Sequence, residues 1–104
     1  MEDKIFEALA SAPRRQILRY LTESDMTASD IAANFEMSKP AISKHLSILE
    51  NAGLIRSKRE GQYIRYQLVW ETLVTTMYDF LRDFRPVDKK PKVTAPEQTA
   101  AAGR

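Results

Sequence analysis

The chain has 104 residues, of which 43% are hydrophobic and 29% charged, and its formal net charge of +2 fits a soluble single domain. With no cysteine and no apolar run long enough to cross a bilayer, disulfides, thiolate nucleophiles, cysteine-bound metals and transmembrane segments are excluded. Because the amino terminus also lacks the basic flank and apolar core of a signal peptide, we expect a cytoplasmic protein without membrane contact.

Two amphipathic helices are predicted at the start of the chain. Residues 3–11 place Ile5, Phe6 and Leu9 on one helical stripe. Pro13 then fits the first turn of a second helix, "PRRQILRYLT", because its missing N–H costs nothing there. This helix should end in the polar sequence "TESD".

A third, short helix is predicted to begin at "TASD". Thr27 can cap the N–H near Asp30 while Asp30 reaches back, a variant of the capping box. Its apolar residues are Ala28, Ile31, Ala32 and Phe35. Only the three residues "EMS" are then expected before the next helix.

The fourth predicted helix, residues 39–51, has two chemically distinct faces. Ser38 is its expected N-cap, which places Pro40 in the first turn. At 100° per residue one arc is mostly apolar: Ala41, Ile42, His45, Leu46, Ile48 and Leu49. The opposite arc is polar: Lys39, Pro40, Ser43, Lys44, Ser47 and Glu50. The apolar arc should pack on a core, and the polar arc should face a partner.

A β-hairpin is predicted over residues 54–68. Gly53 suits the position after a helix that needs a positive φ. Glu60-Gly61 is the expected tight turn. The second strand alternates, with Ile64, Tyr66 and Leu68 on one side and Tyr63, Arg65 and Gln67 on the other.

The last predicted helix covers residues 70–84 and carries a wide apolar stripe with heptad-like spacing. The stripe consists of Trp70, Leu73, Val74, Met77, Phe80, Leu81 and Phe84. We expect residues 1–85 to form one domain and residues 86–104, which are rich in proline and lysine, to form a disordered basic tail.

The middle third of the chain is strongly basic. Residues 37–67 carry six Lys or Arg residues against two Glu residues. A short helix, a turn and a second helix with a polar outer face form a helix-turn-helix, and the basic hairpin after it makes the winged version. The major groove of B-DNA admits one α-helix, so we expect the polar arc of residues 39–51 to face DNA.

The sequence resembles the ArsR-type family of bacterial winged-helix repressors over about residues 3–84. The segments "SAPRRQILRYL", "MTASDIAANFEMSKPAISKHLSILENAGLI" and "REGQYIRYQL" match its pattern in order and spacing, and the likeness is greatest to the metal-independent, autorepressor-like (SdpR-like) branch. The resemblance implies that residues 39–51 read the major groove. It also implies that the hairpin lies along an adjacent minor groove or the DNA backbone, and that the first and last helices pair two subunits.

Two features depart from the family pattern. Ala12 stands where the family often has an acidic cap for the second helix, and Ser11 is the available substitute. The family's metal sensors use cysteines or His/Asp/Glu pairs, whereas this chain has no cysteine and one histidine, His45. We therefore expect no metal site and no cofactor, and the sequence identifies no inducer.

The predicted DNA-contacting residues are Ser38, Lys39, Pro40, Ser43, Lys44, His45, Lys58, Arg59, Gln62, Tyr63 and Arg65. Several have alternatives. His45 lies on the apolar arc and is more readily a packed, hydrogen-bonded or phosphate-touching residue than a base reader. The hairpin cations also discourage edge-to-edge aggregation. For Arg14 and Arg15, salt bridges to the acidic first segment are an alternative at least as strong as phosphate contact.

The sequence thus predicts a mostly α-helical fold with a small β-hairpin, a winged helix-turn-helix of four helices, a hairpin and a fifth helix. The predicted function is repression of transcription by a homodimer on an inverted-repeat DNA operator. The predicted dimer interface consists of Ile5, Phe6, Leu9, Trp70, Leu73, Val74, Met77, Phe80, Leu81 and Phe84. A winged helix used for protein–protein interaction is the alternative. An enzyme is nearly excluded, because the sequence has no cysteine nucleophile, no glycine-rich phosphate loop and no paired carboxylate–histidine arrangement.

Overall fold

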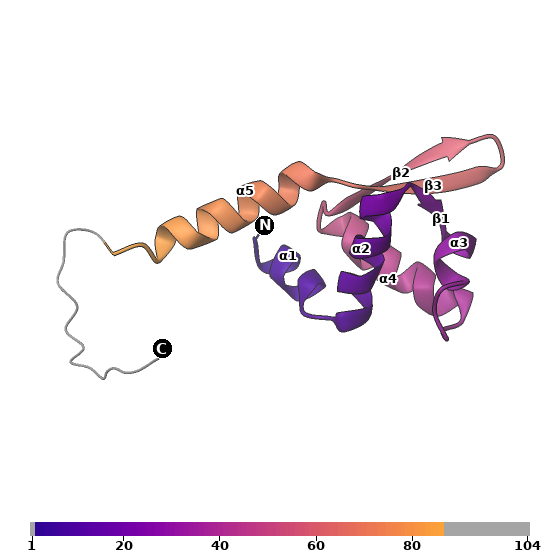
Figure 1. Cartoon of the computed structure of the whole chain (residues 1–104), viewed down its shortest axis with the longest axis horizontal. Coiled ribbons are helices and arrows are strands. Elements are labelled where there is room, and N and C mark those ends of the chain that lie inside the picture. The colour runs from indigo at the N-terminus through magenta and orange to yellow at the C-terminus, as the bar shows by residue number, and fades with distance from the viewer. Residues whose placement is uncertain (1, 87–104) are drawn as a thin grey trace.

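A computed structural model describes residues 2–86, which form five helices and three short strands (Figure 1). The elements in chain order are α1 (Glu2–Leu9), α2 (Ala12–Glu23), β1 (Met26–Thr27), α3 (Ala28–Ala32), α4 (Lys39–Asn51), β2 (Ile55–Glu60), β3 (Tyr63–Leu68) and α5 (Trp70–Asp83). The predicted class, mostly helical with a small antiparallel sheet, is confirmed. The tail predicted for residues 86–104 lies outside the described residues, apart from residue 86.

Local hydrogen bonds fix where three of the helices begin, as the sequence predicted. The Ser11 hydroxyl accepts from the backbone N–H of the third residue of α2, at 3.3 Å. Thr27 Oγ1 accepts from the Asp30 N–H while the Asp30 carboxylate accepts from the Thr27 N–H, both at 3.1 Å. The Ser38 hydroxyl caps α4 in the same way at 3.2 Å. Each cap satisfies an N–H group that the helix itself leaves unpaired.

The third helix is shorter than predicted. It ends at Ala32, and six residues, 33–38, separate it from α4 instead of three. The chain continues in tight turns, in which the Phe35 N–H donates to the Ala32 carbonyl three residues earlier. Phe35 therefore lies outside the helix, with its ring edge against Tyr20 at a centroid distance of 5.7 Å.

The hairpin belongs to a three-stranded antiparallel sheet of order β1-β3-β2, and its first strand was not predicted. Met26 pairs with Tyr66 and Thr27 with Arg65. The hairpin turn also lies one residue later than predicted. Glu60 still pairs with Tyr63, so the turn residues are 61 and 62, and the first of them is a glycine with a φ of 65°.

The core lies between α1, α2, α3, α4 and the base of the hairpin. Its buried residues are Ile5, Ala8, Ile17, Leu18, Leu21, Ile31, Ile42, Leu46, Leu49, Leu54 and Ile55. The two faces predicted for α4 are confirmed, because every residue of the apolar arc is buried or half-buried and every residue of the polar arc is exposed.

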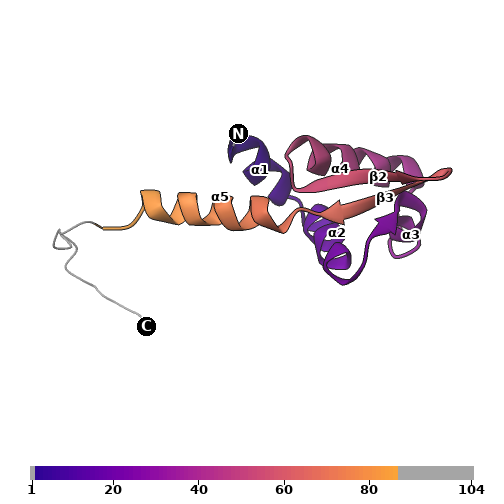
Figure 2. The same ribbon diagram turned by 90° about the horizontal axis from the view of Figure 1, so that it is seen from above.

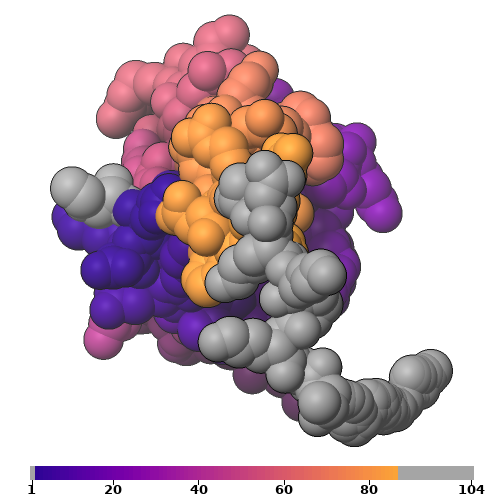
Figure 3. Space-filling model, turned by 90° about the vertical axis from the view of Figure 1, so that its left-hand side faces the viewer, coloured from indigo at the N-terminus to yellow at the C-terminus, as the bar shows by residue number. Residues whose placement is uncertain are grey.

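Helix α5 projects from this body at the end opposite the hairpin tip (Figures 1 and 2). Figure 3 looks onto that end, where α1 and α5 lie side by side. The rings of Phe6 and Phe80 are 5.0 Å apart, and those of Phe80 and Phe84 are 4.9 Å apart. Ile5 belongs to the buried core of the chain, and Leu73, which is half-buried, packs against that core.

Much of the apolar face of α5 is exposed in the single chain. Trp70 is 63% exposed, Leu81 65% and Phe84 69%. Thr76, on the side facing the body, is buried although the sequence did not single it out. Within residues 2–86, none of the helices has both the length and the apolar character needed to span a membrane.

Candidate nucleic-acid interface

The outer face of α4 presents short polar and cationic side chains to solvent. Lys39, Pro40, Ser43 and Lys44 are all exposed, and all lie in the first half of the helix. This half also carries the positive end of the helix dipole, which favours anionic groups. The arrangement therefore suits contact with phosphates and with base edges.

A hollow of about 580 Å³ separates the start of α3, the first half of α4 and the start of β3. It is lined by Thr27, Ala28, Ser29, Asp30, Lys39, Ser43, Gln62, Tyr63, Ile64, Arg65 and Tyr66. Five of the predicted DNA-contacting residues thus share one concave surface, although they come from two separate parts of the chain. The sequence did not predict that the start of α3 lines this surface. A capping box predicts where a helix begins, but not which other segments lie beside it.

The hairpin carries the remaining predicted cations on its exposed surface. Lys58, Arg59 and Gln62 are exposed, and Tyr63 is 58% exposed. Within residues 2–86, neither Lys58 nor Arg59 forms an ion pair, and the same is true of the two lysines of α4. These four cations are available to phosphate oxygens.

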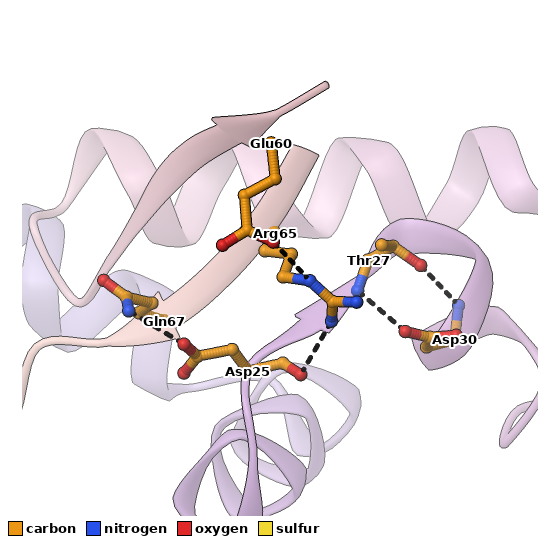
Figure 4. Close-up of polar contacts among 6 residues, drawn as sticks. All are labelled: Asp25, Thr27, Asp30, Glu60, Arg65 and Gln67. Carbon is orange, nitrogen blue, oxygen red and sulfur yellow. Dashed lines mark hydrogen bonds and ion pairs between the residues drawn. The ribbon is translucent and has the colours of Figure 1, made fainter. Parts of the chain in front are cut away.

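Arg65 differs from the other hairpin cations because it already has partners in the chain (Figure 4). Its Nε atom is 3.0 Å from the Glu60 carboxylate, and its Nη1 atom donates to the Asp25 carbonyl at 3.5 Å. Gln67 donates to the Asp25 carboxylate at 2.8 Å on the same side of the sheet. Arg65 therefore joins the hairpin to the loop before β1.

Asp30 is the one carboxylate that lines the hollow. Its hydrogen bonds from the Thr27 backbone and side chain, and the nearby Arg65 guanidinium, lower its pKa from the usual 3.8. The carboxylate is thus ionised at neutral pH and serves as a helix cap. The positive charge of Arg65 offsets part of the negative charge of Asp30 in the lining of the hollow.

His45 faces the interior and not the hollow. Its Nδ1 atom is 3.2 Å from Nη1 of Arg14, which also donates to the Glu7 and Ala8 carbonyls. This geometry agrees with the prediction of a packed, hydrogen-bonded histidine. Within residues 2–86, the salt bridges considered for Arg14 and Arg15 do not form. Arg15 donates instead to the Leu9 carbonyl at 2.7 Å.

The structure thus divides the predicted contact residues into three groups. Lys39, Ser43, Gln62 and Tyr63 line the hollow and are exposed. Ser38, Pro40, Lys44, Lys58 and Arg59 are exposed outside its lining. Arg65 and His45 bind other residues of the chain. Within residues 2–86, no three His, Cys, Asp or Glu side chains are grouped so that they could hold a metal ion.

Residues 11–57, which span α2 to the start of β2, match the model of a family described as "Bacterial regulatory protein, arsR family". The chain is 43% identical over 82 residues to the transcriptional repressor SdpR of Bacillus subtilis, covering 76% of this chain and 91% of that protein.

Two solved structures have the same fold. An ArsR-like transcriptional regulator from Rhodococcus sp. RHA1 superposes with a TM-score of 0.74 at 34% identity, over 80% of this chain and 78% of that one. The homodimeric winged helix-turn-helix domain of Mb0332 from Mycobacterium bovis gives 0.63 at 26% identity, over 84% and 86% of the two chains. The chain belongs to the ArsR family, and it is a winged helix-turn-helix DNA-binding transcriptional regulator and not an enzyme.

Proposed function

We propose that the protein is a transcriptional repressor that binds an inverted-repeat operator as a homodimer. The observation that carries the proposal is the hollow between α4 and the hairpin, with exposed polar and cationic side chains on both sides. In the proposed complex α4 enters the major groove and the hairpin follows the adjacent backbone or minor groove. The bound dimer represses by covering a promoter. The relative SdpR, which is named a repressor, supports this direction of regulation.

The dimer is proposed to form through the exposed face of α5 and the adjoining part of α1. An apolar surface that includes Trp70, Leu81 and Phe84, each more than 60% exposed, is unusual for a monomer. The homodimeric state of the Mb0332 domain supports a second copy of the chain as the partner. Two recognition helices related by a two-fold axis would meet half-sites about one helical turn, or a small multiple of it, apart.

We also propose that repression does not depend on a metal ion. The chain has no cysteine and a single histidine. That histidine, His45, already accepts a hydrogen bond from Arg14, so it is not offered to a ligand.

The proposal is tested by selecting duplexes from a random DNA library and measuring fluorescence anisotropy on the selected duplex and on a scrambled one. We expect an inverted repeat and a preference of about a thousandfold or more. Lys39, Lys44, Lys58 and Arg59 of both subunits would neutralise about eight phosphates, which predicts a log–log salt slope of about −7. Equal binding to both duplexes would contradict the proposal, and no binding at low salt would favour the protein-interaction alternative.

Substitutions on the two sides of the hollow should have different effects. Ser43→Ala is expected to lower the preference for the selected duplex about tenfold, because this hydroxyl is proposed to contact base edges. Arg59→Ala should weaken binding to both duplexes alike and reduce the salt slope of the dimer by about 2, because it removes one phosphate contact per subunit. Anisotropy titrations at several salt concentrations measure both effects.

The matched control for this pair is Ser47→Ala, the same change one turn further along the exposed face of α4 and outside the hollow. It should leave the preference nearly unchanged. If Ser43→Ala weakened binding to both duplexes equally, the base-reading role of that residue would be wrong.

A further inference from the structure

We infer that Arg14 is a positioning residue for DNA recognition, because its guanidinium joins the carboxyl end of α1 to His45 of the recognition helix α4. The inference rests on the proposed function and adds a residue that lies on neither the hollow nor the hairpin. Arg14 is half-buried at the start of α2. It acts through other residues and does not itself contact DNA.

The first part of the connection is at the end of α1. The Nε atom of Arg14 donates to the Ala8 carbonyl at 2.8 Å, and Nη2 donates to the Glu7 carbonyl at 3.1 Å. The last carbonyls of a helix have no partner within it, and α1 has no basic residue in its last turn. The guanidinium therefore satisfies the Ala8 carbonyl and adds a second donor to the Glu7 carbonyl, which also accepts from the Ala10 N–H at 3.2 Å. It also places a positive charge at the negative end of the helix dipole.

The second part reaches α4. The Nη1 atom of Arg14 lies 3.2 Å from Nδ1 of His45. A guanidinium has donors and no acceptor, so Nδ1 must be the unprotonated nitrogen of a neutral ring. One side chain thus fixes three groups on two helices, and its planar fork holds them in a fixed geometry.

The connection matters because α1 and α4 have different tasks in the proposed dimer. Helix α1 carries Phe6, which packs on Phe80 of the proposed dimer helix α5. Helix α4 carries Ser43 and Lys44, which directly precede His45. The two recognition helices must match the spacing of the half-sites. A residue that fixes α4 relative to α1 therefore controls how well both helices fit the operator together.

The connection should also depend on pH. Partial burial, followed by the charges of Arg14 on α2 and Lys44 on α4, lowers the pKa of His45 from its usual 6.5. At pH 7.5 the ring is neutral and accepts the hydrogen bond. As the pH falls below 6.5 and through the lowered value, the ring gains a proton on Nδ1, can no longer accept, and is repelled by Arg14. Because folding lowers the pKa of His45, the contribution of the neutral ring to the free energy of unfolding is fully present above pH 6.5. This contribution is lost as the pH falls through the lowered pKa.

The experiment measures anisotropy binding of the full chain to the selected and scrambled duplexes between pH 5.5 and 7.5. For the wild type we expect the preference for the selected duplex to fall progressively as the pH is lowered from 6.5 to 5.5. The full loss, reached once the ring is protonated, should be about five- to tenfold, the equivalent of one hydrogen bond. His45→Gln should retain most of the preference and lose its pH dependence, because the amide oxygen accepts from Arg14 without titrating. Arg14→Gln and His45→Ala should each have a low, pH-independent preference.

The matched control is Arg15→Gln, which removes a similar bond to the carbonyl of Leu9 without touching α4. It should keep the wild-type preference and pH profile. A wild-type preference that does not change with pH, together with equal behaviour of Arg14→Gln and Arg15→Gln, would overturn the inference while the proposed function stands. The inference would also be overturned if the wild type bound both duplexes more tightly at pH 5.5 and His45→Gln abolished this gain. Such a result would identify His45 as a phosphate contact. If the wild type shows no preference at pH 7.5, the proposed function itself fails.

Discussion

Replacing Val74 and Leu81 together by glutamate is expected to convert the protein to monomers and to weaken operator binding by about a hundredfold or more. Both side chains lie on the outer face of α5, where they are 46% and 65% exposed. In the proposed dimer each new carboxylate would be buried without a cation, which costs several kcal/mol per ion. In the single chain both carboxylates would remain in water, so the fold should persist.

Light scattering during size-exclusion chromatography measures this change directly. The variant should have a mass near 11.9 kDa, and the wild type about twice that value. DNA binding should fall because a monomer engages one half-site and loses the gain from two linked contacts. Thr75→Glu, on an exposed polar part of the same helix, is the control and should remain dimeric. An unchanged dimer mass for the double variant would show that α5 is not the interface.

The second large effect is expected from Leu46→Ala, which should lower the free energy of unfolding by about 3 kcal/mol. Leu46 lies on the inner arc of α4 and is 1% exposed. Its removal takes away apolar burial and leaves a cavity that the neighbouring helices fill only in part. A domain of this size has a total stability of about 5–10 kcal/mol, so the loss is a large fraction of it.

Urea unfolding followed by circular dichroism measures this loss, at one protein concentration because dimerisation adds to the apparent stability. Ser47→Ala, the exposed neighbour on the same helix, is the control and should change the free energy by less than about 0.5 kcal/mol. A loss below about 1 kcal/mol for Leu46→Ala would mean that α4 is held mainly by contacts other than its apolar arc.

The two effects act on different requirements of the proposed function. Leu46 keeps the recognition helix on the body of one subunit, so its polar arc stays exposed beside the hollow. Val74 and Leu81 would keep two such helices at a fixed separation. Both variants should remain folded, but only the glutamate variant should bind the operator weakly, because its monomers engage a single half-site.

Helix starts and helix faces could be predicted from the sequence because both depend on residues a few positions apart. Ser11, Thr27 and Ser38 each accept from an N–H group three residues later. The period of α4 similarly separated a buried arc from an exposed one. The predicted length of α3 was wrong because an α-helix and a tight turn differ little there. In the helix an N–H donates to the carbonyl four residues earlier, and in the turn to the carbonyl three residues earlier.

Contacts between distant segments could not be predicted in the same way. Strand β1 is two residues long and exists only through its pairing with β3, about forty positions later. An arginine has five donors and can satisfy a carboxylate, a carbonyl or a phosphate. The sequence therefore left open whether Arg14, Arg15 and Arg65 would bind acids, backbone or DNA.

By itself the sequence determined the order of the helices, their caps, the polar face of α4 and the basic character of the hairpin, because short-range hydrogen bonding and periodicity are written in neighbouring residues. The tertiary structure alone decided that Lys39 and Ser43 share a hollow with Tyr63, that Glu60 holds Arg65, and that Arg14 reaches His45. These outcomes depend on how the core packs α1, α3, α4 and the sheet around one another. Tertiary packing therefore decides which hydrogen-bond and ion-pair partners a side chain meets, because the local sequence allows several.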